Sequence, residues 1–205
     1  MSRGETKART EEIIGELIHE SDRGLALISA ELLNEELEAL LRSKLRIKRP
    51  AIRKRVADPM FNSSTGPLHS FSSRIKFAYA FGWIAEDLFE DLERIRSIRN
   101  EFAHSSSALR FTSQSIAARA KLLRIGYEFE TLFMFLQTPH SKILKMAPGT
   151  ISSPRAAFLG CTIFARGELM GLAGKFGKNF KPEPRREIML RWDKVKALMD
   201  AGKLK

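Results

Sequence analysis

The stretch that decides the fold runs from residue 25 to residue 41 and reads LALISAELLNEELEALL. Its apolar side chains recur at the spacing of one face of an α-helix. They are Leu25, Ile28, Leu32, Leu33, Leu37, Leu40 and Leu41. Ser21 and Asp22 are good helix N-cap residues, and Gly24 weakens a continuous helix through this point. The pattern therefore predicts an amphipathic helix here, preceded by another helix that ends near residues 20–23.

The helical period continues through the first two thirds of the chain. It predicts a helix near Ile13 to Ile18 and further helices at about 70–82, 86–104 and 113–136. Residues 46–70 contain three prolines, a glycine and a polar cluster, so we expect a long loop there. No useful length of the chain alternates as a strand does. The sequence predicts an all-α protein, most simply a multi-helix antiparallel bundle.

The charge of the chain is distributed unevenly. Residues 1–136 carry 21 Lys and Arg against 19 Asp and Glu, whereas residues 137–205 carry 14 against 5. We therefore divide the chain into a helical domain, residues 1–139, and a basic C-terminal extension, residues 140–205. A basic surface indicates an acidic partner, such as a nucleic acid or an acidic protein.

Four glycines interrupt the apolar part of the extension, at positions 160, 167, 171 and 174. Each glycine costs about 1 kcal/mol in a helix interior, so they argue against a long helix there. A short helix is expected further on, at about 185–199.

The composition excludes several classes of protein. A single cysteine, Cys161, can form neither an internal disulfide nor a multi-cysteine zinc site, which favours a reducing cytoplasm. The N-terminal MSRGETKARTEE is not a signal peptide, and no run approaches the ~20 apolar residues of a membrane span. The chain also lacks a P-loop, a G-x-S-x-G turn and an H-E-x-x-H pair. We expect no membrane partner, metal or cofactor, and favour a non-enzymatic function.

The fourth predicted helix contains an arginine on its apolar face. Arg99 shares a stripe with Leu88, Leu92, Ile95 and Phe102. A guanidinium in that position needs a partner, and Glu20 or Asp22, at the junction of the first two helices, could supply it. Arg96, Asn100 and His104 form a polar line beside the stripe. A structural ion pair and a functional cluster are about equally good explanations.

Three short motifs resemble the mannitol operon repressor family over roughly residues 10–136. They are ESDRG at 20–24, PL at 67–68 with FSSRIK at 71–76, and RNEFAH at 99–104. The resemblance implies an all-helical domain and a bacterial regulator of sugar-alcohol genes without a standard DNA-reading motif. Charged residues of these motifs are expected to form a structural polar cluster, namely Glu20, Asp22, Arg23, Arg74 and Arg99.

A second resemblance supports a different class of function. Arg99, Asn100 and His104 fit the R-x4-H pattern of the HEPN superfamily of helical, nucleic-acid-associated proteins. The resemblance implies a metal-independent ribonuclease in which Arg99 would bind the scissile phosphate, His104 would transfer a proton and Asn100 would orient both. Such motifs commonly face each other across a dimer.

A dense run of cations spans residues 42–55, from the end of the helix predicted at 25–41 into the predicted loop. It comprises Arg42, Lys44, Arg46, Lys48, Arg49, Arg53, Lys54 and Arg55, with no acid among them. This density predicts contact with nucleic-acid phosphates, and a second basic segment spans residues 175–196. The leading hypothesis is a homodimeric, regulatory helical protein that holds acidic partners. The alternatives are the ribonuclease and a helical protein-interaction module without affinity for nucleic acid.

Overall fold

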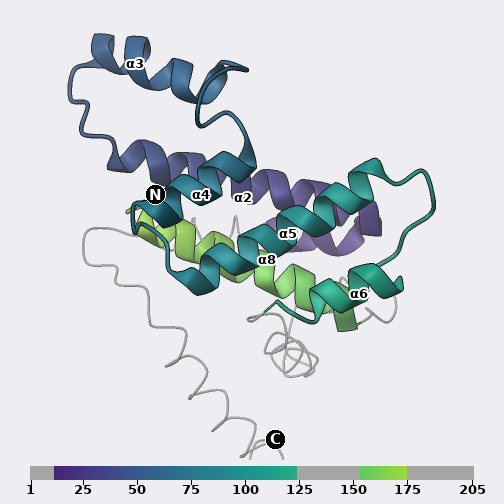
Figure 1. The fold of residues 1–205 in the computed structure, drawn as a ribbon. Coiled ribbons are helices and arrows are strands. Elements are labelled where there is room, and N and C mark those ends of the chain that lie inside the picture. Colours follow the sequence, from purple (N-terminus) through teal and green to yellow (C-terminus); the bar gives the residue numbers. More distant parts are fainter. Residues whose placement is uncertain (1–11, 124–152, 175–205) are drawn as a thin grey trace, which may run out of the picture.

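The structure, a computed structural model, describes residues 12–123 and 153–174 (Figure 1). Within these residues the regular structure is helical and contains no strand, so the predicted all-α class is confirmed. Residues 12–19 are helical, and the helices that follow are α2 (Asp22–Lys44), α3 (Pro50–Asn62), α4 (Phe71–Ala80), α5 (Glu86–His104), α6 (Gln114–Ala120) and α8 (Ser153–Leu172).

The long helix α2 lies at the centre of the packing. It contacts α4, α5 and α8, and α8 in turn contacts α5 and α6. Its apolar face is fully buried at Leu25, Leu33, Leu37 and Leu40. Burying one such side chain contributes about 1.5–3 kcal/mol, so this face supplies much of the stability of the bundle. The predicted amphipathic helix at 25–41 is confirmed.

Two further helices match their predicted bounds because their ends carry local signals. Ser70 caps α4 by accepting a hydrogen bond from the backbone N–H of Ser73 at 3.1 Å. Gly82 follows α4 with φ of 66°, a conformation that suits glycine after a helix C-terminus. α5 begins at Glu86 and ends at His104, as expected.

The long loop predicted at 46–70 is wrong, because residues 50–62 form α3. Pro50 occupies the start of the helix, where its missing N–H is not needed. Pro59 lies inside the helix, where it removes the hydrogen bond that an N–H at this position would make to the carbonyl of Arg55. Ala57 and Phe61 are buried and hold the C-terminal half of α3 against the protein. The burial of these two side chains, which the pattern of prolines does not show, offsets the cost of Pro59.

The glycine-rich stretch also forms a helix, contrary to expectation. α8 is 20 residues long, and Phe158, Leu159, Cys161 and Leu169 on it are almost completely buried in the common core. Their burial outweighs the intrinsic cost of the glycines, because tertiary packing provides most of the stability of a helix in a protein. α8 lies in the range assigned to the basic extension, and the boundary at residue 139 stays a prediction.

The helix predicted at 113–136 is shorter than expected. α6 ends at Ala120, and the backbone N–H groups of Leu122 and Leu123 bond to carbonyls three residues earlier. This tight final turn leaves Leu123 buried and Leu122 exposed. The rest of that prediction, the helix at 185–199 and the basic segment at 175–196 lie outside the described residues.

None of the helices in the described ranges is both long enough and apolar enough to cross a membrane.

Candidate functional site

The start of α2 gathers polar contacts from three parts of the chain. Ser21 accepts a hydrogen bond from the backbone N–H of Gly24 at 2.9 Å, which satisfies one free donor of the first turn. Asp22 accepts a hydrogen bond at Oδ2 from the backbone N–H of Phe111 at 2.8 Å. Its Oδ1 lies 2.5 Å from Nη1 of Arg155. Asp22 therefore joins α2 to α8 and to the segment before α6.

Arg155, at the start of α8, also caps the C-terminal end of the helix at residues 12–19, which precedes α2. Its Nη2 donates to the backbone carbonyls of Glu20 at 2.6 Å and Ile18 at 3.2 Å. Sequence reasoning missed this residue. The available signal was a lone arginine directly before the apolar run at 156–165, because a cation placed there needs a carboxylate.

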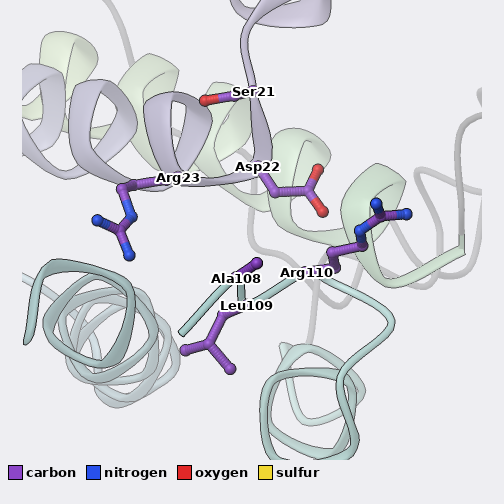
Figure 2. Close-up of a pocket in the computed structure, with 6 residues that line it drawn as sticks. All are labelled: Ser21, Asp22, Arg23, Ala108, Leu109 and Arg110. Carbon is purple, nitrogen blue, oxygen red and sulfur yellow. The ribbon is translucent and has the colours of Figure 1, made fainter. Parts of the chain in front are cut away.

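A shallow pocket of about 450 Å³ opens beside these residues (Figure 2). It is lined by Ser21, Asp22, Arg23, Ala108, Leu109 and Arg110. Nη2 of Arg23 donates to the carbonyl of Ser105 at 2.7 Å, so the ESDRG motif meets the residue that follows the RNEFAH motif. Arg23 and Arg110 are exposed, and the carboxylate of Asp22 also lines the pocket, so its lining contains both signs of charge.

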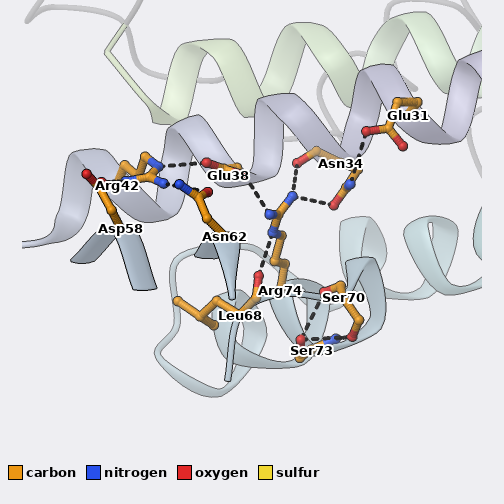
Figure 3. Close-up of polar contacts among 10 residues, drawn as sticks. All are labelled: Glu31, Asn34, Glu38, Arg42, Asp58, Asn62, Leu68, Ser70, Ser73 and Arg74. Carbon is orange, nitrogen blue, oxygen red and sulfur yellow. Dashed lines mark hydrogen bonds and ion pairs between the residues drawn. The ribbon is translucent and has the colours of Figure 1, made fainter. Parts of the chain in front are cut away.

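A second polar centre surrounds the buried Arg74 of α4 (Figure 3). Its Nε donates to the carbonyl of Leu68 at 2.8 Å, and its Nη1 donates to Oδ1 of Asn34 at 2.7 Å. Its Nη2 lies 2.5 Å from Oε2 of Glu38. Burial lowers the pKa of Arg74, while the carboxylate of Glu38 opposes that change. The guanidinium of Arg74 thus links α4 to the middle of α2.

Arg42 continues this network and attaches α3. It donates to Glu38 at 2.7 Å and to Asp58 at 2.8 Å, and its guanidinium lies 4.2 Å from the ring centre of Phe61. Burial lowers the pKa of Arg42, but the hydrogen bonds to Glu38 and Asp58 outweigh that effect and raise it. Arg42 is therefore engaged within the protein.

Comparison with known proteins identifies the family. A family model described as mannitol repressor (MtlR) matches residues 10–145. The chain belongs to the mannitol repressor family. The match confirms the resemblance found in the sequence and extends it to residue 145.

Individual members of the family are more distant. The chain is 30% identical over 94 residues to the mannitol operon repressors of Escherichia coli strains K12 and O6:H1 CFT073. These matches cover 46% of this chain and 47% of each relative, so the chain spans about half the length of the curated relatives it matches. An X-ray structure of the MtlR–HPr complex from Escherichia coli shares the fold, with a TM-score of 0.59 and 19% identity, over 78% of this chain and 98% of that chain.

In this member of the mannitol repressor family, the residues of the expected polar cluster lie in two places. Glu20, Asp22 and Arg23 lie at the start of α2, whereas Arg74 and Arg99 lie on α4 and α5. The expected pairing of Arg99 with Asp22 is wrong, because Asp22 holds Arg155. In the described part of the chain, Arg99 donates a hydrogen bond to Oδ1 of Asn100 at 3.1 Å and forms no ion pair with Glu20.

Arg99 lies at the edge of the apolar face of α5 rather than within it. Ile98 is fully buried beside it, and Arg99 is half-buried. Arg99 lines a cavity of about 290 Å³ between α2, α4 and α5. Its lining is Ala30, Glu31, Asn34, Ser70, Phe71, Ser72, Arg96, Arg99 and Asn100. His104 is exposed and does not line this cavity, and the ribonuclease hypothesis stays a prediction.

Proposed function

We propose that this chain is a transcriptional regulator of the mannitol repressor type that acts through a protein partner. The match of the family model to residues 10–145 carries the proposal. The solved structure that shares the fold contains HPr bound to MtlR, so HPr is the partner we expect. The net charge of +11 would favour a partner with an acidic surface.

A row of exposed aromatic rings offers an anchor for such a partner. Phe77 and Phe81 are 37% and 59% exposed at the end of α4, whereas the exposed Tyr79 stacks separately on Phe89. The ring of Phe81 stacks between those of Phe77 and Trp83, at centroid distances of 5.7 and 5.0 Å. Stacking holds the rings in place before binding, and aromatic residues are enriched at the energetic centres of protein interfaces.

Titration calorimetry with purified HPr tests the partner. We expect binding by the full chain and at least tenfold weaker binding by Phe81→Ser. Leu122→Ser is the matched control, because Leu122 is 61% exposed two residues after the end of α6. Helix α6 lies well away from α4 in Figure 1. Absence of binding by the unchanged chain would refute HPr as the partner. Equal weakening by both variants would refute the aromatic row as its anchor.

A reporter gene behind the mannitol promoter of the host tests the regulation. Deleting the gene for this chain should raise expression, and Phe81→Ser should behave like the deletion while Leu122→Ser restores repression. Binding of HPr without any effect on the reporter would instead support the hypothesis of a protein-interaction module.

A further inference from the structure

The segment from residue 44 to residue 55, named here the basic arm, holds seven Lys and Arg residues and no acid. Its seven cations are all exposed: Lys44, Arg46, Lys48, Arg49, Arg53, Lys54 and Arg55. No Asp or Glu occurs between residues 39 and 57. The arm begins at the end of α2 and covers the first half of α3.

The nearest acidic residues in sequence do not neutralise the arm. Glu38 and Asp58 both bind Arg42, at 2.7 and 2.8 Å. Across residues 12–123 and 153–174, no ion pair is found for any of the seven cations of the arm. The contact found for Arg53 is a donation to the carbonyl of Ile47 at 3.2 Å, which leaves its charge in place.

The position of these cations on α3 adds to the positive potential. Arg49 is the N-cap residue, Arg53, Lys54 and Arg55 follow within the first half of the helix, and its first turn holds no acid. A helix N-terminus is the positive end of the helix dipole, where cations are unfavourable. A polyanion bound there would relieve the repulsion among the cations and also the repulsion from the dipole.

The distribution of the cations indicates the kind of polyanion. They extend over the loop at residues 45–49 and over the first half of α3, whose six residues rise about 9 Å, and seven cations along this length are more than one small anion can contact. α3 also stands apart from the helices of the bundle in Figure 1, so an elongated ligand can reach it. A nucleic-acid backbone repeats its negative charge over such a distance.

We infer that the basic arm binds the phosphate backbone of duplex DNA without reading its sequence. The exposed side chains on the first half of α3 are Lys, Arg and small or apolar residues, which supply charge for phosphates but no amide side chain to read adenine. This inference goes beyond the proposed function, because HPr binding does not require it.

Fluorescence anisotropy with a random 20-base-pair duplex tests the arm at several salt concentrations. The logarithm of the affinity changes by about 0.9 per contacted phosphate for each unit of log salt, so five to seven contacts predict a slope of about −4.5 to −6. The triple variant Arg53→Gln, Lys54→Gln, Arg55→Gln should lower the magnitude of the slope by about 2.7. Its affinity should fall at least tenfold at low salt.

The matched control removes the same charge from other exposed surfaces. It is the triple variant Lys76→Gln, Arg110→Gln, Lys121→Gln, and all three of these residues are exposed. The control should keep at least half of the affinity. Equal weakening by both triple variants would show that net charge alone drives binding and would overturn the inference, as would unchanged affinity of the arm variant.

Two further ligands distinguish the source of the phosphates. Tighter binding to anionic phospholipid vesicles than to duplex DNA, at equal phosphate concentration, would overturn the assignment to nucleic acid. Tighter binding to single-stranded RNA would overturn the assignment to duplex DNA. HPr binding by the arm variant should match that of the unchanged chain, which separates failure of this inference from failure of the proposed function.

Discussion

Replacing the buried Arg74 with methionine tests whether the polar centre between α2 and α4 stabilises the fold. Methionine has a similar length, so the change removes the charge and hydrogen bonds while largely filling the space. The carbonyl of Leu68 and the amide oxygen of Asn34 lose donors at 2.8 and 2.7 Å. Glu38 loses one of two guanidinium partners and keeps Arg42 at 2.7 Å.

The size of the effect follows from these contacts. Leaving a buried acceptor unpaired costs about 1–3 kcal/mol, and breaking a buried ion pair costs about 3–5 kcal/mol. Because the Glu38 side chain is 26% exposed and keeps Arg42, we expect the lower end of this range, a loss of about 3 kcal/mol in the free energy of unfolding that comes mainly from the buried Arg74 and its acceptors. For a chain of this size the melting temperature should fall by about 6–12 °C.

Urea unfolding followed by circular dichroism measures this loss. Arg96→Met is the control, because the side chains of the Arg96–Glu93 pair on α5 are 28% and 24% exposed. A pair so open to solvent contributes at most about 1 kcal/mol. The stability of Arg74→Lys should lie between those of Arg74→Met and Arg96→Met, because an ammonium group cannot make all the hydrogen bonds of the planar guanidinium. An Arg74→Met variant no less stable than Arg96→Met would refute the reasoning.

Three further predictions use other positions. Gly66→Ala should destabilise the fold by about 1–3 kcal/mol, because the added Cβ would lie 2.5 Å from two backbone oxygens. Gly167→Ala places its Cβ in open space and should stabilise α8 by about 0.5–1 kcal/mol. Thermal melts that rank the two variants in the opposite order would contradict this prediction. Arg155→Met should cost about 2 kcal/mol, because Asp22 loses its cation, and a melt like that of the unchanged chain would count against the joint at the start of α2. Single-stranded RNA incubated with the protein in EDTA should stay intact, because exposed His104 lies outside the arginine-lined cavity of α5; cleavage that disappears in His104→Ala would establish the ribonuclease instead.

The success of sequence reasoning varied with how local each signal was. Ser70, Gly82 and the helical periodicity act within a few residues, so the bounds of α4 and α5 were predictable. The prolines of α3 and the glycines of α8 argue against a helix, because the sequence pattern does not show the burial that offsets their cost. For Phe61 and Phe158, that burial exists only once distant helices have packed.

The candidate site shows the same division. The motifs predict functional or structural roles for Asp22, Arg74 and Arg99. Asp22 and Arg74 form ion pairs that connect α2 to α8 and to α4. The partner of Asp22 was wrong, because Arg155 is 133 residues away and sequence spacing carries no information about such a contact. An arginine on an apolar face predicts only that some partner is needed.

The sequence by itself determined the all-α class, the buried face of α2 and the family, because periodicity and short motifs are properties of neighbouring residues. Tertiary structure alone decided the pairing of Asp22 with Arg155 and the engagement of Arg42 within the protein. It also left the cations of the basic arm exposed. The sequence gives the charge and polarity of each residue, whereas the partner of each charge depends on which surfaces the packing of helices brings together.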